Sequence, residues 1–313
     1  MPDSAITFAK DHPVKSLSAR VAATAMLAAC AAGAPATRTA PPPAPAPAAP
    51  APVDTPAPAV VAPPAPARLA PQHGRFLAHQ VVEIHNDYEG LPSRQVIGYR
   101  SWFSVTVRDT ADAAHRLATT FVVDSLVADS GVMLPPTMNL AAARGLTVTG
   151  WVAPSGELQD PVFSDSGVVQ SLSLLLGWFR RFFPHLPADG VQPGREWSDT
   201  LTTTEPGGTA TLARTSELHV RAGAAWEHRP EGEALRLDAA ETYRFTGSGD
   251  GGGQPLELRG TGERAGTDYL AADGRYLGGT SRDSVALTIT LPQQGITIPQ
   301  RQLGTLSVQL LPR

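Results

Sequence analysis

Two histidines and one carboxylate lie close together near the start of the predicted folded part, and these are residue types that bind zinc. His79, Glu83 and His85 all occupy odd positions of a segment that we predict to be a β-strand, so they share one face of it. Spacings of four and two residues along one strand are loose for a first coordination shell. The sequence therefore favours a solvated polar face, and we expect neither a metal site nor a cofactor.

The other chemistry-bearing residues form no recognisable catalytic motif. The sequence contains no H-E-x-x-H, no G-x-S-x-G, and no G-x-G-x-x-G after a predicted strand. The only lysines, Lys10 and Lys15, precede the predicted folded part, which excludes a lysine Schiff base or a phosphate-loop lysine there. Acidic residues show no evident pair of the kind used in glycoside hydrolysis. We expect no enzymatic activity and no catalytic residue.

Cys30 is the only cysteine in the chain, and it closes a short apolar stretch near the N-terminus. Basic residues precede this stretch, which begins at Val21. Its length of about nine residues is far below the roughly 20 that a membrane-spanning helix needs. The net charge of −4 gives no electrostatic support for nucleic-acid binding. The start of the chain therefore looks like a targeting segment, and we expect no nucleic-acid partner.

The run Leu27-Ala28-Ala29-Cys30 resembles the lipobox of bacterial lipoproteins. The resemblance implies a signal peptide over residues 1–29 and acyl chains such as palmitate on Cys30, which would anchor the protein in a membrane. Ala31, in place of an aspartate, implies the outer membrane of the cell envelope, with the domain facing the periplasm. An ordinary secretory signal cleaved near residues 32–34 is the alternative.

Residues 30–71 consist of Cys30 followed by a stretch that is almost wholly proline and alanine. Proline removes amide donors and fixes φ, so this stretch forms neither helix nor sheet. We predict a disordered, proline-rich tether that is partly polyproline II, about 100 Å long if fully extended at about 3.1 Å per residue. A proline-rich recognition motif is the alternative reading of the same composition.

The remaining residues, 72–313, show the period-2 alternation of antiparallel strands with one face on a core. Two of the predicted apolar faces are Ile97, Tyr99, Phe103, Val105 and Val107, and then Leu117, Phe121, Val123 and Val127. The predicted strands cover residues 76–87, 96–108, 117–127, 146–153, 195–204, 210–222, 233–247, 255–264, 267–278, 284–291 and 303–311. The glycine-rich residues 247–253 are predicted to form a loop.

Residues 165–183 are predicted to form one long apolar helix, ended by Pro184, and residues 137–144 a short helix. The fold class expected is mainly β, with a large curved antiparallel sheet, either a half-barrel or an open barrel, around these helices. Leu172, Leu175, Phe179 and Phe182 form one stripe of the long helix. The stripe is either part of a filled core or the lining of a cavity for an apolar ligand. A helix lying on a membrane surface is a third reading.

The order of elements is similar to the half-barrel of lipoprotein carriers of the LolA/LolB type. The residues from Trp178 to Pro187 and from Val191 to Trp197 also resemble a feature of uncharacterised bacterial envelope lipoproteins. The first resemblance implies a lipid or other apolar ligand held in the curved sheet, and the second names no activity. The alternative function is a structural protein that docks onto another component of the cell envelope.

Overall fold

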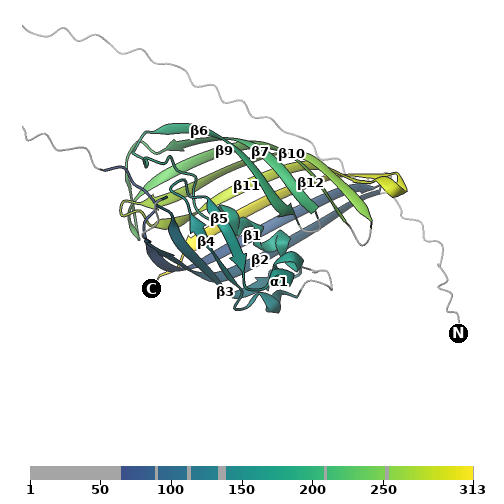
Figure 1. Ribbon diagram of the computed structural model, residues 1–313, viewed down its shortest axis with the longest axis horizontal. Helices are drawn as coiled ribbons and strands as arrows, with labels where there is room; N and C mark the ends of the chain where they lie inside the picture. The colour runs from purple at the N-terminus through teal and green to yellow at the C-terminus, as the bar shows by residue number, and fades with distance from the viewer. Residues whose placement is uncertain are drawn as a thin grey trace, which may run out of the picture. The chain divides into compact units, whose positions relative to one another are not determined.

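The computed structural model describes residues 65–88, 91–110, 114–132, 139–207, 210–250 and 254–312, and every structural statement below concerns those residues. Cys30, the predicted signal peptide and the predicted tether up to residue 64 lie outside them. The lipid anchor and the location of the protein therefore stay predictions. The described residues form a twelve-stranded sheet with a few short helical segments (Figure 1).

Every strand of this sheet pairs with its neighbours in the antiparallel sense. The order across the sheet is β5-β4-β3-β2-β1-β12-β11-β10-β9-β7-β6, and β8 pairs with β9 off this path. The strands are β1 (Gln72–Tyr88), β2 (Leu91–Arg108), β3 (Leu117–Ala128), β4 (Thr147–Val152), β5 (Leu158–Phe163), β6 (Glu196–Gly207), β7 (Ala210–Ala222), β8 (Glu227–Arg229), β9 (Gly232–Asp250), β10 (Pro255–Ala271), β11 (Tyr276–Leu291) and β12 (Ile296–Leu310). The predicted mainly β, antiparallel class is confirmed.

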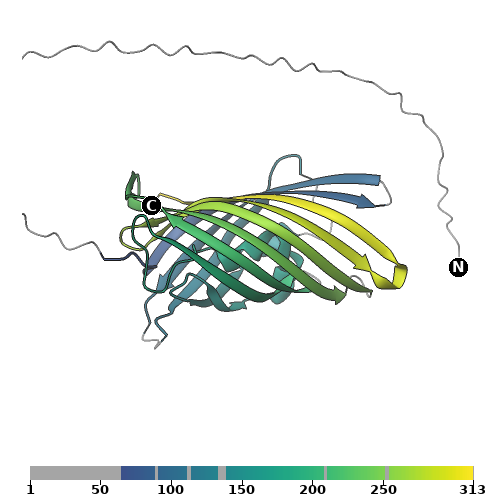
Figure 2. The same cartoon turned by 90° about the horizontal axis from the view of Figure 1, so that it is seen from above.

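The sheet is curved but does not close. Its first and last strands are neighbours, because β1 pairs with β12, while β5 and β6 remain as the two edges. Figure 2 shows the long strands curving around the side of the molecule that holds the helical segments. The prediction of a large open antiparallel sheet is therefore confirmed, and the seam between β5 and β6 becomes the place to look for access to the interior.

The alternation read from the sequence correctly identifies the inner face of β2. Ile97, Tyr99, Phe103, Val105 and Val107 are all buried. The prediction for β3 is wrong at one position, because the register shifts between Trp102 and Phe103 and an extra residue enters β3 there. As a result Leu126 is buried, whereas Val127 is 52% exposed.

The chain between Pro255 and Leu291 contains two long strands in place of the three shorter ones that we predicted. Ala265 and Gly266 lie inside β10, where a strand break was expected. The turn lies later, where Gly274 adopts a φ of +85°, a conformation that glycine tolerates. Strand β9 continues beyond the predicted strand end at Gly247 through residues 248–250, which were predicted to lie in a loop. At Gly247 a Cβ atom would lie 2.7 Å from the Thr211 carbonyl oxygen. Its missing side chain permits this close strand contact.

The predicted long helix over residues 165–183 is wrong. The segment contains α1 (Ser166–Ser171), α2 (Ser173–Leu176) and the 3₁₀ turn η2 (Gly177–Arg181). Serine and glycine at these junctions favour helix weakly. The Tyr99 hydroxyl also donates to the Leu175 carbonyl, which provides a partner outside the helix. The short helix predicted over 137–144 is the 3₁₀ turn η1 (Leu140–Ala143), capped by the Asn139 side chain, and residues 137 and 138 lie outside the described residues.

The helical segment packs onto the sheet through aromatic rings. Phe182 contacts Phe76, Phe103 and Tyr276 edge to face, with ring centroids 5.1, 5.6 and 5.0 Å apart. Phe179 contacts Phe103 in the same way, at 5.3 Å. Edge-to-face pairs stabilise by about 0.5–1.5 kcal/mol beyond the burial of their area. The principal core therefore lies between η2 and strands β1 to β3.

A second apolar cluster lies under the other half of the sheet, around Leu186, Val220, Leu235 and Leu237. The chain before β1 joins it, since Ala67 is buried and forms an antiparallel bridge with Val191. The last residues of the predicted tether, from about residue 65 onward, thus pack on the domain. The cavity described next borders this second cluster.

Candidate functional site

The four residues proposed from the sequence as an apolar ligand lining lie in the principal core. Leu172 and Leu175 are fully buried, and Phe179 and Phe182 are 2% and 3% exposed. Their neighbours are the rings and aliphatic side chains of β1 to β3. None of the four lines the cavity between the two edge strands that is described below. The stripe therefore fills a core on this side of the sheet.

The histidines that suggested a metal site have separate partners on the outer face. His79 Nε2 lies 2.8 Å from an oxygen of Asp129, and His85 Nε2 lies 2.6 Å from Glu83 Oε1. Glu83 also accepts a hydrogen bond from Arg94, which is the main reason that its pKa falls to about 2. No group of three or more metal-binding side chains occurs in the described part of the chain. The three residues therefore have local partners: His79 contacts Asp129 after β3, His85 contacts Glu83 on the same strand, and Glu83 contacts Arg94 on β2.

A cavity of about 670 Å³ lies at the seam between the two edge strands, and we call it the seam cavity. One wall is the β4–β5 turn with β5, and the opposite wall is the middle of β6. Its floor is the inner face of β7, β9 and β10, and the end of η2 with residues 183–185 closes another side. The apolar part of the lining includes Phe183, Leu201, Leu218, Val220, Leu237 and Ala239. Ligand sites in proteins have volumes of about 300–1,000 Å³, so the size suits a small molecule.

Charged side chains stand at one end of this apolar floor. Glu241 on β9 accepts a bond of 2.7 Å from Arg214 on β7, and its second oxygen lies 3.4 Å from Arg181 of η2. The Glu241 and Arg214 side chains are only 8% and 11% exposed. The guanidinium of Arg214 also stacks 3.4 Å from the centroid of the Tyr243 ring. This network ties the helical segment to the sheet beside the cavity.

Opposing forces set the pKa of Glu241. Burial raises the pKa, but the charges of Arg181 and Arg214 and the hydrogen bonds outweigh it, so the pKa lies below its ordinary value. Burial, followed by the neighbouring charge of Arg181, lowers the pKa of Arg214. An arginine remains charged in proteins even so. The carboxylate and both guanidiniums are therefore ionised at neutral pH.

Arg264 on β10 occupies the centre of the inner face. The strand register places it directly between Glu241 on β9 and Asp283 on β11. Glu241 is held by its two arginines, and Asp283 accepts a hydrogen bond of 2.6 Å from the Tyr243 hydroxyl. Among the described residues Arg264 forms no ion pair within 4.0 Å and no side-chain hydrogen bond. Its guanidinium lines the seam cavity as a cation without a direct partner.

Asp268 lies deeper on the same strand and also lines the cavity. The Tyr276 hydroxyl donates to it at 2.9 Å. Burial raises the pKa of Asp268 to about 6, although the positive charge of Arg264 and the bond from Tyr276 oppose the shift. The same burial, with the Asp268 charge, raises the pKa of Tyr276. Carboxyl groups with raised pKa values are concentrated at functional sites, which adds weight to the seam cavity.

The sequence does contain a signal for this charged group, and our reading of it missed that signal. Three of the charged residues lie on the same face of their strand as buried or half-buried apolar residues. They are Arg214 with Leu218, Glu241 with Leu237, and Asp283 with Val285. A charged residue on an apolar face is costly unless it is paired, and it therefore marks either a buried network or a site. Arg264 and Asp268 share their strand face with Gly260, Gly262 and Gly266 as well as with Leu258 and Leu270, so the apolar pattern on this face is weak.

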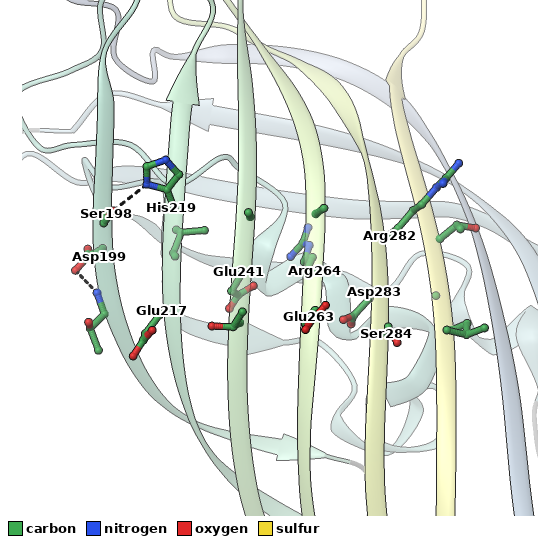
Figure 3. Close-up of a pocket in the computed structure, with 18 residues that line it drawn as sticks. Ser198, Asp199, Glu217, His219, Glu241, Glu263, Arg264, Arg282, Asp283 and Ser284 are labelled. Atoms are coloured by element: carbon green, nitrogen blue, oxygen red, sulfur yellow. Dashed lines mark hydrogen bonds between the residues drawn. The ribbon is translucent and has the colours of Figure 1, made fainter.

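A broader depression of about 1,240 Å³ crosses β6, β7 and β9 to β12 (Figure 3). The exposed side chains along it include Glu217, His219, Glu263 and Arg282. The Ser198 hydroxyl lies 3.0 Å from His219 Nδ1, as a serine–histidine pair would require. The two residues are directly opposite each other in the register, and the cross-strand pair His73 and Thr106 has the same 3.0 Å separation. Strand pairing explains this contact.

Comparison with known proteins gives little further information. No family model matches the chain, and no curated protein matches it. DynF from the dynemicin biosynthesis pathway of Micromonospora chersina aligns with 81% of this chain and 88% of its own, at 9% identity and a TM-score of 0.21. Pseudomonas aeruginosa OccK2 aligns with 78% of this chain and 99% of its own, at 8% identity and a TM-score of 0.25. Acinetobacter baumannii OccAB4 aligns with 77% of this chain and 98% of its own, at 8% identity and a TM-score of 0.23.

Likenesses this distant support no conclusion about fold or function. Within the described ranges, no helix reaches the length and apolarity required to cross a membrane.

Proposed function

We propose that this chain is a non-enzymatic binding protein of the cell envelope that holds a ligand with an apolar body in the seam cavity. The observation that carries the proposal is the cavity itself. Leu201 and Ala239 in its apolar lining are partly exposed, and about 670 Å³ beside them is not filled by protein atoms. A domain without a ligand would be expected to cover such side chains, because empty space forfeits contacts.

The position of the cavity also suits a binding role. It lies between β5 and β6, the two strands that leave the sheet open, so a ligand would enter without unfolding a hydrogen-bonded strand pair. The principal core is packed separately around Phe103 and Phe182. The domain would therefore keep its fold in the empty and in the occupied state.

The alternative function, docking onto another envelope component, has weaker support. The large apolar side chains exposed in the described part are Leu91, Val96, Val127 and Val162, which lie on β2, β3 and β5. Single exposed apolar residues of this kind are normal on protein surfaces, and contiguous patches are the sign of a docking site. We therefore place the binding function first.

Native mass spectrometry of the mature protein tests the binding function. We expect the mature protein, purified from a bacterial envelope, to retain a non-covalent apolar ligand that dissociates on collisional activation. Ala239→Leu should reduce this occupancy, because Ala239 lines the seam cavity, and Ala240→Leu on the exposed face is the matched control. A ligand-free protein would contradict the proposal, and so would equal occupancy in both variants.

The proposed location rests on Cys30 and has its own test. Intact-mass and peptide analysis of the membrane-bound protein should find a chain that begins at Cys30 and carries covalent acyl groups. A mature chain that begins near residues 32–34 and carries no lipid would show an ordinary secretory signal instead. That result would remove the anchor and leave the binding function to be judged separately.

A further inference from the structure

We infer that the ligand of the seam cavity is an amphiphile with an anionic head group, and that Arg264 binds that head group. This inference rests on the proposed function and names the chemical class of the ligand. The head group would be a carboxylate or a phosphate, since both accept the parallel hydrogen bonds that a guanidinium donates. The apolar tail would lie on Leu201 and Ala239, the partly exposed apolar side chains of the lining.

The first argument is that Arg264 has no direct partner although two carboxylates flank it. Glu241 and Asp283 are its neighbours in the register, at a typical Cβ separation of about 5 Å. Arg214 and Arg181 engage Glu241, and the Tyr243 hydroxyl engages Asp283. The flanking acids thus have other partners, and no described carboxylate lies within ion-pair distance of the Arg264 guanidinium.

The second argument concerns the place of this cation. Arg264 is partly buried, lines the seam cavity, and stands at the border of its apolar floor. A charged group that loses water without gaining a partner is costly, so a site of this kind favours an incoming anion. Arg180, which also lines the cavity and has no ion pair among the described residues, adds a second positive charge.

Asp268 would repel an anionic head group bound at Arg264, so its replacement provides a second test. It lies four residues along β10 from Arg264 on the same strand face, and the two groups interact electrostatically. In the empty site this carboxylate attracts the Arg264 guanidinium, and it would repel an anion bound there. Asp268→Asn should therefore tighten the binding of an anionic amphiphile, whereas Arg264→Gln should weaken it.

Three probes with the same chain length separate the head group from the tail. We would titrate decanoate, decyl phosphate and decanol into the full chain carrying Cys30→Ala, so that no anchor lipid contributes, and measure binding by calorimetry. We expect at least one anion to bind about tenfold or more tightly than decanol, as charge-assisted hydrogen bonds imply. The stronger anion distinguishes a carboxylate from a phosphate ligand.

The variants decide between the outcomes. Arg264→Gln should reduce binding of the preferred anion to the level of decanol, while Arg259→Gln, an exposed arginine of the same strand, should leave it unchanged. Equal binding of all three probes, unaffected by Arg264→Gln, would overturn the inference and leave the proposed function standing. Failure of every probe to bind the parent protein would contradict both. If Arg264→Gln does not fold, tightening by Asp268→Asn supports the inference, and its absence overturns it.

Discussion

Replacement of Glu241 by glutamine should destabilise the domain by about 3 kcal/mol, the lower end of the range for breaking a buried ion pair. The Glu241 and Arg214 side chains are 8% and 11% exposed, so Arg214 would be left as a buried charge without its carboxylate. Glutamine keeps one acceptor for the 2.7 Å hydrogen bond, which places the loss at the lower end. The free energy of unfolding of a domain is about 5–15 kcal/mol, so a loss of this size is easily measured.

The pH dependence of this effect has a definite sign. The pKa of Glu241 is lowered in the folded state, so its contribution to stability is present above the unfolded-state pKa, about 4.5. That contribution disappears as the pH falls through the lower folded-state value. The difference between the parent protein and Glu241→Gln should therefore be complete at pH 7 and should shrink below about pH 4.5.

Urea denaturation of the full chain, followed by tryptophan fluorescence, measures the difference in unfolding free energy. Glu263→Gln is the matched control, because Glu263 is an exposed carboxylate on the neighbouring strand β10. The control should change stability by less than about 0.5 kcal/mol. A loss below about 1 kcal/mol for Glu241→Gln, or an equal loss in the control, would refute the account of a buried network.

Two further changes follow from the same structure. Asp268→Asn should stabilise the domain at pH 8 relative to the parent, by on the order of 3 kcal/mol, because the pKa of Asp268 is raised from 3.8 to about 6. The stabilisation that the parent gains from this group is present below about pH 4 and is lost as the pH rises through 6. Thermal unfolding at pH 5 and pH 8 should therefore show that the stability difference between variant and parent grows with pH. A difference that does not change with pH would count against this assignment. Gly156→Ala should cost at least about 2 kcal/mol more than Gly131→Ala, measured by urea denaturation. Both glycines have positive φ, but a Cβ at Gly156 would lie 2.1 Å from the Pro184 carbonyl oxygen, whereas a Cβ at Gly131 would have nothing within 4 Å. Equal losses of stability in the two variants would show that the structure relaxes around this contact.

Most of the long strands were predictable because they carry a local signal, as where Ile97, Tyr99 and Phe103 alternate with polar residues. The short strands β5 and β8 were not predicted, and the turn at Gly274 was placed inside a strand. Val127 could not be placed correctly, because the bulge opposite Trp102 depends on how two strands meet. The helical segment failed for a similar reason, since Tyr99 lies far away in sequence and bonds to the Leu175 carbonyl.

The seam cavity could not be read from the sequence. Its walls come from β5 and β6 and its floor from β7, β9 and β10, so it exists only once the register and curvature of the whole sheet are set. The apolar helical stripe drew attention to the wrong side of that sheet, because strong hydrophobicity marks a well-packed core as readily as a binding site. Glu241 on an apolar strand face was the better clue.

The most direct test of the central claim is a crystal structure with a bromine-labelled amphiphile. We would soak crystals of the full chain carrying Cys30→Ala with 11-bromoundecanoate and locate the bromine by its anomalous scattering. The account predicts a peak beside Leu201 and Ala239, with the carboxylate at Arg264. A peak beside His219 on the outer face of the broader depression, or no ordered peak at all, would contradict it.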